Sequence, residues 1–533
     1  MVNVKKIKNK WILALIIIFF IQLFTNILVL RKDNIYPLYN SMEPIGSAYK
    51  LAGDISNGKV SDLFKIHPLE NPPLLGYLLM FNILLFGGSL DTMVHTNIIF
   101  LIILIYALYN LGKRLGDKLT GLLSVIICLS FPAVFGMSRI LWNEYPLMCF
   151  VTLSFHLLFM TDNFKNKKYS FFWAFSVACA LLIRFTLPIY IIAPVSFYVI
   201  KSFRIRKNYK RIIINILFCL FVILMLSGWW YLFSLKAVLA DKLSLFKGGS
   251  VNILSNINRI WYNLCNISMY LPLFTLFIIS LPLLLVRRTV EKTTILIAII
   301  APLILFMLSP NRTGFNSNRY FIPILPLFAL SISSAFFLID KRFLRIIPSI
   351  LLLVLCYIQF ILINLGFGEY FTLSQDKNRI NKRDEDIIIE QGKVRPYVSE
   401  VSPEDLLDLI NKNKKQYRPT LLFLGDFTNI ESFFRIGILR RKIPIIVISS
   451  VQIIKGNPNL QNLLDDPKEV EKGEFILALS DNQDERDDAQ YMYSTVNLPK
   501  MINYFKEKKD NYKKISEFSD KFGIKFALFQ KIE

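Results

Sequence analysis

The stretch that decides the fold is WILALIIIFFIQLFTNILVL, residues 11–30, an uninterrupted apolar run of membrane-spanning length. Lysines precede it and no small-residue cleavage site follows it, so we expect a retained membrane helix rather than a cleaved signal peptide. The rest of the chain has a similar character, because 54% of its 533 residues are hydrophobic while its formal net charge is +23. Soluble domains do not combine these properties, and the sequence therefore predicts a membrane protein.

Apolar runs of similar length recur up to Gly366 and predict a polytopic α-helical protein with about eleven transmembrane helices. Basic residues gather in alternate connections between the runs, which by the positive-inside rule face the cytoplasm. We therefore expect a multi-pass protein of the cell membrane, with a cytoplasmic N-terminus and an extracytoplasmic C-terminal part. The predicted spans are residues 11–30, 94–112, 119–136, 144–161, 171–187, 188–201, 212–233, 264–286, 293–309, 320–339 and 346–366.

The first predicted outer loop contains two signals of helical structure. Ser41, Met42, Glu43 and Pro44 form a helix-start pattern, which predicts a short helix ending near residues 57–58. After a double proline, the apolar stretch 74–86 is short for a span and ends at two glycines. It predicts a helix that lies at the membrane interface.

Beyond residue 370 the pattern changes to that of a soluble α/β domain. Short apolar runs at 421–424, 443–448, 475–479 and 526–529 predict strands, and 403–411 is compatible with a helix. We therefore divide the chain into a transmembrane domain, 1–366, and an extracytoplasmic α/β domain, 370–533. Basic and acidic residues nearly balance in the second domain, which argues against a nucleic acid as partner.

Polar and charged residues cluster at the predicted outer ends of helices. Ionisable groups at membrane depth are costly, and they usually face a cavity or a polar ligand. The six cysteines show no paired spacing, so neither a zinc site nor a disulfide framework is indicated. The outer-end residues that carry the candidate site are Glu43, Asp54, His67, Asn71, Arg139, Asn143, Glu144, Arg184, Arg312, Arg319 and Tyr320.

The order of these residues resembles the GT-C membrane glycosyltransferases, in the branch of protein mannosyltransferases and aminoarabinose transferases (glycosyltransferase family 39-like). The resemblance covers roughly residues 1–366. It rests on Glu43 on a first-loop helix, His67-Pro68, Pro72-Pro73-Leu74, Ser138-Arg139 followed by Glu144, Arg184, and Arg319-Tyr320 followed by Pro323 and Pro326. Met42 stands where the family commonly has an aspartate.

The resemblance implies an inverting transfer of a sugar from a polyprenyl-phosphate carrier at the extracytoplasmic face, to a glycan, lipid or protein acceptor. It implies Glu43 as base or metal partner, and a divalent metal ion stays open, with Glu43 and His67 as the residues that could hold it. Basic residues would hold the lipid phosphate.

The chemistry agrees with this on its own terms, because the reaction needs a carboxylate for the acceptor hydroxyl and cations for the departing phosphate. We therefore expect Arg184 and Arg319 to approach one another over a cavity. The candidate catalytic residues are Glu43 and Asp54; the candidate donor-phosphate residues are Arg139, Arg184, Arg312, Arg319 and Tyr320; the candidate acceptor or loop contacts are His67, Asn71, Asn143 and Glu144.

Each assignment has a structural alternative. Glu43 could serve only as a charge at a helix terminus, and Asp54 could be a solvated loop carboxylate. Arg139 and Glu144 could pair only with each other or snorkel, and the Arg319-Tyr320 pair could be an interfacial anchor. His67 could be a structural turn residue, and Arg184 could reach the headgroups of ordinary lipid. For the whole chain, a non-catalytic lipid or glycan transporter is the alternative, although we find no repeat of two halves and no pair of broken helices.

The alternation of basic loops predicts the side on which the C-terminal domain lies. Single cysteines introduced at Ser402 or Asn429 should react with a membrane-impermeant thiol reagent added outside intact cells. A cysteine introduced at Arg206, in a predicted inner loop, should react only after the cells are opened. Labelling of the first two positions only from the cytoplasmic side would overturn the topology.

Overall fold

The computed structural model describes residues 3–32, 39–59, 72–204, 209–246, 251–286, 288–309, 318–339, 342–364, 403–415, 420–423, 446–449, 474–479, 504–519 and 525–532. It divides into two compact units: Met1–Leu28 with Asp54–Arg395, and Val29–Gly53 with Pro396–Glu533. Each unit is described by itself.

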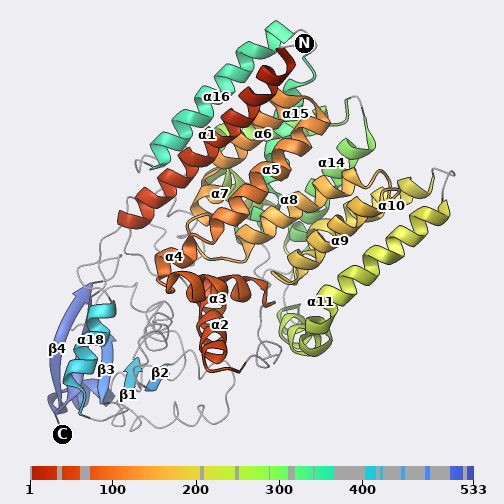
Figure 1. Ribbon diagram of the computed structural model, residues 1–533. Helices are drawn as coiled ribbons and strands as arrows, with labels where there is room; N and C mark the ends of the chain where they lie inside the picture. The colour runs from red at the N-terminus through yellow and green to blue at the C-terminus, as the bar shows by residue number, and fades with distance from the viewer. Residues whose placement is uncertain are drawn as a thin grey trace. The chain divides into compact units, whose positions relative to one another are not determined.

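Helices account for nearly all of the described chain before residue 365 (Figure 1). They are, in chain order, α1 (Asn3–Lys32), α2 (Tyr39–Ser56), α3 (Leu74–Phe86), α4 (Leu90–Val94), α5 (Asn97–Leu115), α6 (Lys118–Ser130), α7 (Pro132–Met137), α8 (Glu144–Met160), α9 (Lys167–Leu181), α10 (Pro188–Phe203), α11 (Tyr209–Phe246), α12 (Ile253–Asn263), the π-helix η2 (Leu264–Ser268), α13 (Leu271–Leu283), α14 (Val290–Met307), the short 3-10 helices η4 (Asn318–Tyr320) and η5 (Ile322–Ile324), α15 (Leu325–Phe336) and α16 (Arg342–Asn364).

Every predicted span contains a helix, although three spans are interrupted. Phe131 separates α6 from α7, which begins at Pro132; η2 precedes α13, and two 3-10 turns precede α15. Four segments of the described chain are long and apolar enough to cross a membrane by length and composition, and the number of crossings stays a prediction. Those four are Lys10–Leu28, Thr92–Leu115, Tyr209–Ser234 and Val290–Met307.

Both helical signals of the first predicted loop correspond to helices. The helix α2 begins at Tyr39, so Ser41 is not its capping residue as the sequence suggested; the helix ends before Asn57 and Gly58, where Gly58 has a φ of 76°. The helix α3 has the predicted bounds and ends on Gly87, whose left-handed φ of 82° lets its amide reach the carbonyl of Ile83.

Small polar residues join the helices of the core. Ser124 of α6 lies 2.7 Å from Ser333 of α15, and Ser280 of α13 lies 2.8 Å from Ser331 of the same helix. A Cβ added at Gly112 would lie 2.7 Å from the Cα of Gly121, so α5 and α6 approach as closely as two glycines permit. Close packing and interhelical hydrogen bonds are what hold helices together in lipid, where the hydrophobic effect between them is small.

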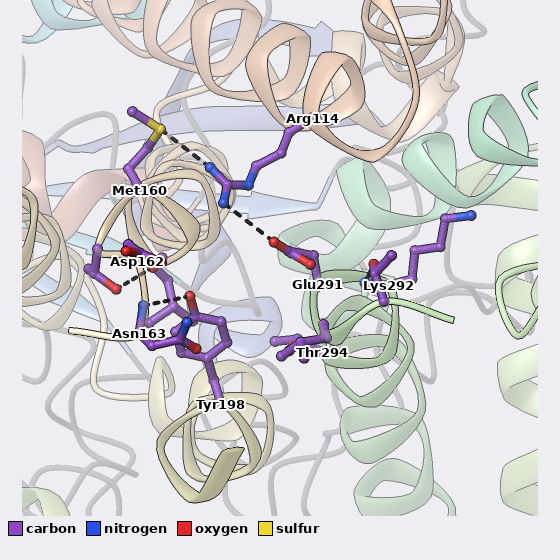
Figure 2. Close-up of polar contacts among 12 residues, drawn as sticks. Arg114, Met160, Asp162, Asn163, Tyr198, Glu291, Lys292 and Thr294 are labelled. Carbon is purple, nitrogen blue, oxygen red and sulfur yellow. Dashed lines mark hydrogen bonds and ion pairs between the residues drawn. The ribbon is translucent and has the colours of Figure 1, made fainter. Parts of the chain in front are cut away.

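The connections that the charge pattern assigns to one side of the membrane lie together in the structure. At the end of α5, Arg114 donates to Glu291 at the start of α14, 3.4 Å away, and Figure 2 shows the guanidinium between Glu291 and Met160 at the end of α8. In the turn after α8 the amide of Asn163 donates to the hydroxyl of Tyr198 in α10. The ends of α5 and α8 therefore meet the start of α14.

That turn has an uncommon backbone. Asp162, Asn163 and Phe164 have φ values of 49°, 56° and 60°, a run of left-handed residues that L-amino acids adopt at a cost of roughly 1–2 kcal/mol each. The surrounding groups over-determine the conformation, because the Thr161 hydroxyl accepts from the Phe164 amide and Asn215 donates to the Phe164 carbonyl.

The C-terminal unit contains a mixed sheet in the order β2-β1-β3-β5-β4 (Figure 1). β1 pairs in parallel with β2 and β3, and β5 is antiparallel to β3 and β4. The helix α18 buries Leu407 and Ile410, and its Asn413 carbonyl accepts from Gln530 of β5. The elements are α18 (Pro403–Asn413), β1 (Thr420–Phe423), β2 (Ile446–Ser449), β3 (Phe475–Leu479), β4 (Tyr512–Ser519) and β5 (Lys525–Lys531).

The four predicted strands and the predicted helix all correspond to elements of this unit, whereas β4 was not predicted. Its sequence, YKKISEFS, carries charged side chains along an edge strand. Edge strands often have this composition because charge hinders pairing with another chain. Hydrophobic periodicity therefore could not reveal it.

Asp117, in the connection between α5 and α6, should contribute to stability in two ways. Its carboxylate caps α6 by accepting from the Thr120 amide at 2.9 Å, and it pairs with Arg345 at 2.5 Å. Burial raises the pKa of this carboxyl, but the hydrogen bonds from Thr120 and the Arg345 charge outweigh it and leave the pKa below its ordinary value. Stability from Asp117 is therefore present above the unfolded pKa and is lost as the pH falls through the folded one.

We expect Asp117→Ala to lower the midpoint of thermal unfolding in detergent more than Asp117→Asn, which keeps the cap and loses the charge. The free energies of unfolding of the two variants should differ by about 1 kcal/mol, the usual contribution of a capping side chain. Equal midpoints for the two variants would show that the cap contributes nothing.

Candidate functional site

A buried ion pair lies at the start of α8. The Nη2 atom of Arg184 is 3.1 Å from Oε1 of Glu144, and both side chains are more than nine-tenths buried. Neither Arg184 Nε nor Glu144 Oε1 makes a hydrogen bond to a described residue. The pair is therefore held by charge, with donor and acceptor capacity left over.

The neighbouring helices fix the backbone that carries Arg184. The residue follows the last turn of α9, where its amide donates to the Ala180 carbonyl. The amide of Leu74, the first residue of α3, donates to the Leu182 carbonyl at 2.9 Å, and Tyr231 of α11 donates to the Leu181 carbonyl at 3.0 Å. Three helices therefore converge on this turn, which positions the guanidinium.

A second arginine belongs to the same cluster through two tyrosines. The hydroxyl of Tyr190, in the first turn of α10, donates to the Tyr320 carbonyl at 3.0 Å. Arg319 donates to the Tyr320 hydroxyl at 3.3 Å, with its guanidinium carbon 5.0 Å from the ring centre. Charges on Glu144, Arg184 and Arg319 all act on the Tyr190 hydroxyl. The five residues Glu144, Arg184, Tyr190, Arg319 and Tyr320 are called the arginine cluster below.

Polar groups with unused capacity adjoin this cluster. Asn143, directly before Glu144, is 2% exposed, does not cap α8, and its Oδ1 makes no hydrogen bond to a described residue. The indole Nε1 of Trp142 is also buried and makes no hydrogen bond to a described residue. Buried polar atoms without protein partners are rare and usually indicate a ligand or water, so this turn is suited to bind hydroxyl groups.

Arg139 has a different set of partners from those that its sequence spacing suggested. Its Nε donates to Asn26 of α1 at 3.0 Å, and its guanidinium lies 5.1 Å from the centre of the Phe135 ring. Glu144 pairs with Arg184, so the sequence alternative in which Arg139 and Glu144 pair only with each other is wrong.

The remaining predicted residues are described only in part or not at all. Asp54 lies in the last turn of α2 and is half-buried. Glu43 belongs to α2, but its side chain lies outside the described part of the structure, as do His67, Asn71 and Arg312. Among the described residues no three of His, Cys, Asp and Glu group closely enough to hold a metal ion.

Sequence reasoning missed Tyr190 and Trp142. Both are aromatic residues in apolar surroundings, where tyrosine and tryptophan ordinarily serve as packing or interfacial residues. A usable signal for Tyr190 was its position two residues after Pro188, because the first turn of a helix that begins next to Arg184 must lie close to that arginine.

Comparison with known proteins places this geometry in context. Residues 70–231 match the family model described as dolichyl-phosphate-mannose-protein mannosyltransferase, a segment that contains Arg139, Asn143, Glu144, Arg184 and Tyr190. No curated protein sequence matches the chain.

Solved structures extend the likeness to nearly the whole chain. ArnT from Cupriavidus metallidurans without ligand matches with a TM-score of 0.63 and 11% identity over 98% of each chain. The same protein bound to undecaprenyl phosphate matches with a TM-score of 0.62 and 10% identity, over 96% of this chain and 97% of that one. The oligosaccharyltransferase of Archaeoglobus fulgidus matches with a TM-score of 0.53 and 12% identity, over 97% of this chain and 74% of that one.

These comparisons define the class. The chain has the fold of the GT-C membrane glycosyltransferases, and the resemblance predicted from the sequence is confirmed. At these identities the structural likeness establishes the fold, while the donor, the acceptor and the role of each residue are matters of proposal.

The buried ion pair should show strong energetic coupling. Removing one partner of a buried pair leaves an uncompensated charge and lowers the free energy of unfolding by about 3–5 kcal/mol, whereas replacing both partners with apolar residues lowers it far less. We therefore expect Glu144→Leu and Arg184→Leu each to destabilise the protein strongly and the double variant to lose much less than their sum, as measured by unfolding in detergent.

The half-exposed pair Arg114 and Glu291, 3.4 Å apart, provides the matched control. Its cycle of leucine variants should give a coupling of at most about 1 kcal/mol, because exposed pairs are screened by solvent. Additive losses at Glu144 and Arg184 would show that the two side chains do not depend on each other.

Proposed function

We propose that this chain is a membrane glycosyltransferase that moves a sugar from a polyprenyl-phosphate carrier to an acceptor hydroxyl at the extracytoplasmic face, with inversion at the anomeric carbon. The observation that carries the proposal is the arginine cluster. In it, Arg184 and Arg319 come from segments far apart in the sequence, and Glu144, Tyr190 and Tyr320 contact or border them.

A buried cationic cluster is suited to bind a phosphate group. Guanidinium groups bind phosphate oxygens through a planar fork with two parallel hydrogen bonds. In the structure Glu144 compensates the charge of Arg184, while Arg184 Nε makes no hydrogen bond to a described residue. The guanidinium can therefore donate to a phosphate oxygen while the ion pair with Glu144 stays intact.

The proposed reaction is a single displacement. The acceptor oxygen forms a bond to the anomeric carbon while the bond from that carbon to the phosphate oxygen breaks, and the lipid phosphate leaves with the bonding electrons. Glu43 accepts the proton of the acceptor hydroxyl, and the arginine cluster stabilises the negative charge that develops on the departing phosphate. If a divalent ion takes part, Glu43 and His67 are the residues that we propose to hold it.

The donor class is supported by the likeness to ArnT, which has been solved with undecaprenyl phosphate bound. Asn143 and Trp142, with buried polar atoms next to the cluster, are candidates for contacts to the sugar or the acceptor. We propose that the division at residues 366–370 separates the transferase domain from an extracytoplasmic domain.

The test of the function is purification with native lipids, followed by mass spectrometry of bound polyprenyl phosphates and of products formed with candidate acceptors. We expect a co-purifying polyprenyl-phosphate sugar that is consumed when the right acceptor is added. The double variant Glu144→Gln/Arg184→Gln, which leaves neither charge of the buried pair uncompensated, should reduce the bound lipid. A bound lipid-linked sugar that no acceptor consumes would favour a binding or transport protein instead.

Glu43→Gln is the sharpest single change, because it keeps the shape of the side chain and removes its charge. A positioned general base contributes about 10²- to 10⁴-fold in rate, whereas a carboxylate at a helix terminus contributes only about 0.3–1 kcal/mol of stability. We expect a folded protein that binds the lipid donor and transfers the sugar at least about a hundredfold more slowly. Near-normal turnover would exclude Glu43 as the base, and Asp54 or Glu144 would then have to be tested in that role.

A further inference from the structure

The apolar part of the first helix carries two amide side chains, Gln22 and Asn26. Ile17, Phe20, Ile21 and Phe24 of α1 are about half exposed or more, as expected for side chains that face lipid. Gln22, by contrast, is 2% exposed, and Asn26 is half-buried one turn further on. Amide side chains in a membrane helix are costly unless they find partners, so their placement needs an explanation.

Their partners are the two residues Ser138 and Arg139. The Asn26 amide nitrogen donates to the Ser138 hydroxyl at 2.8 Å, while its oxygen accepts from Arg139 Nε at 3.0 Å. Gln22 donates to the same Asn26 oxygen at 3.1 Å. Asn26 therefore holds Ser138 with its amide nitrogen and Arg139 with its amide oxygen, which fixes the orientation of Asn26 and of the guanidinium.

The backbone of the same turn is held by a residue of α5. Asn97, at the start of α5 and 4% exposed, donates to the carbonyls of Ser138 at 3.1 Å and Ile140 at 2.8 Å. Buried amides therefore fix the backbone around Arg139, and α1 fixes the side chain. A simple snorkelling arginine needs none of this, because a flexible side chain reaches the headgroup region by itself.

We propose that Asn26, supported by Gln22, is a positioning residue that orients Arg139 toward the phosphate of the lipid donor, so that the first helix forms part of the donor site. The inference rests on the proposed function. Nε contacts Asn26 and the Phe135 ring lies against the guanidinium, so the plane of the fork is set before the lipid arrives. A preset fork loses less entropy on binding a phosphate than a mobile one.

The proposal is tested by a double-mutant cycle with undecaprenyl phosphate as the probe, in nanodiscs of zwitterionic phosphatidylcholine. Asn26→Leu should weaken binding of the probe about three- to tenfold, the loss expected when one hydrogen bond is removed. Arg139→Ala should weaken it at least about tenfold. In the Arg139→Ala background Asn26→Leu should have no further effect, because Asn26 acts through Arg139.

Asn26→Asp separates orientation from simple interhelical adhesion. A carboxylate keeps the contact with Arg139 Nε but loses the hydrogen bond that Asn26 donates to Ser138, so a purely structural role predicts a small loss of stability and normal binding of the probe. The proposal predicts the same small loss of stability together with weakened binding, because the added carboxylate competes with the phosphate for Arg139. Thr25→Leu is the matched control on α1, since the Thr25 hydroxyl donates only within its own helix, to Ile21, and this variant should bind normally.

The outcomes distinguish this inference from the proposed function. Normal binding by Asn26→Leu and Arg139→Ala, together with weak binding by the double variant Glu144→Gln/Arg184→Gln, would overturn the role of α1 and leave the function intact. Equal competition by anionic phosphatidylglycerol would also overturn it, because the arginine would then be a general headgroup site. If wild-type protein does not bind the probe, the inference falls together with the proposed function.

Discussion

The constraint on which the site depends is that a charge at membrane depth must be compensated by the protein. Burying an isolated charge costs many kcal/mol, so an arginine can be placed among apolar helices only beside an opposite charge or a ligand that supplies one. Arg184 meets the condition with Glu144 at 3.1 Å. Because the pair joins the turn after α9 to the start of α8, the compensation also fixes the geometry of the cluster.

The two ends of the bundle satisfy this constraint in different ways. Around Arg114 the charges are partly exposed and paired with neighbours, and the polar contacts of the adjoining turn are used to hold an unusual backbone (Figure 2). At the other end Glu144, Arg184 and Asn143 are buried, and each has a polar atom that makes no hydrogen bond to a described residue. The first arrangement stabilises the fold, whereas the second leaves capacity for a ligand.

Much of the architecture could be predicted from the sequence, because in a membrane the backbone must satisfy its own hydrogen bonds and apolar length reveals each helix. The bounds of α3 and the end of α2 followed from glycines that terminate helices. The start of α2 and the strand β4 did not follow. A cap depends on the conformation of the preceding chain, and an edge strand is shaped by the need to avoid pairing as well as by burial.

The site was predictable by residue type and less so by pairing. Charged residues at helix ends identified Arg139, Glu144, Arg184 and Arg319, since polarity at membrane depth is visible in a sequence. The choice of partner is not visible in the same way, because Glu144 is five residues from Arg139 yet pairs with Arg184, 40 positions away. Asn26 is a further example. The sequence shows only an amide in a long apolar helix, and its contact with Arg139, 113 positions away, is visible only in the structure. Spacing along the chain limits which side chains can lie at one end of the bundle, and packing of the helices decides which of them meet.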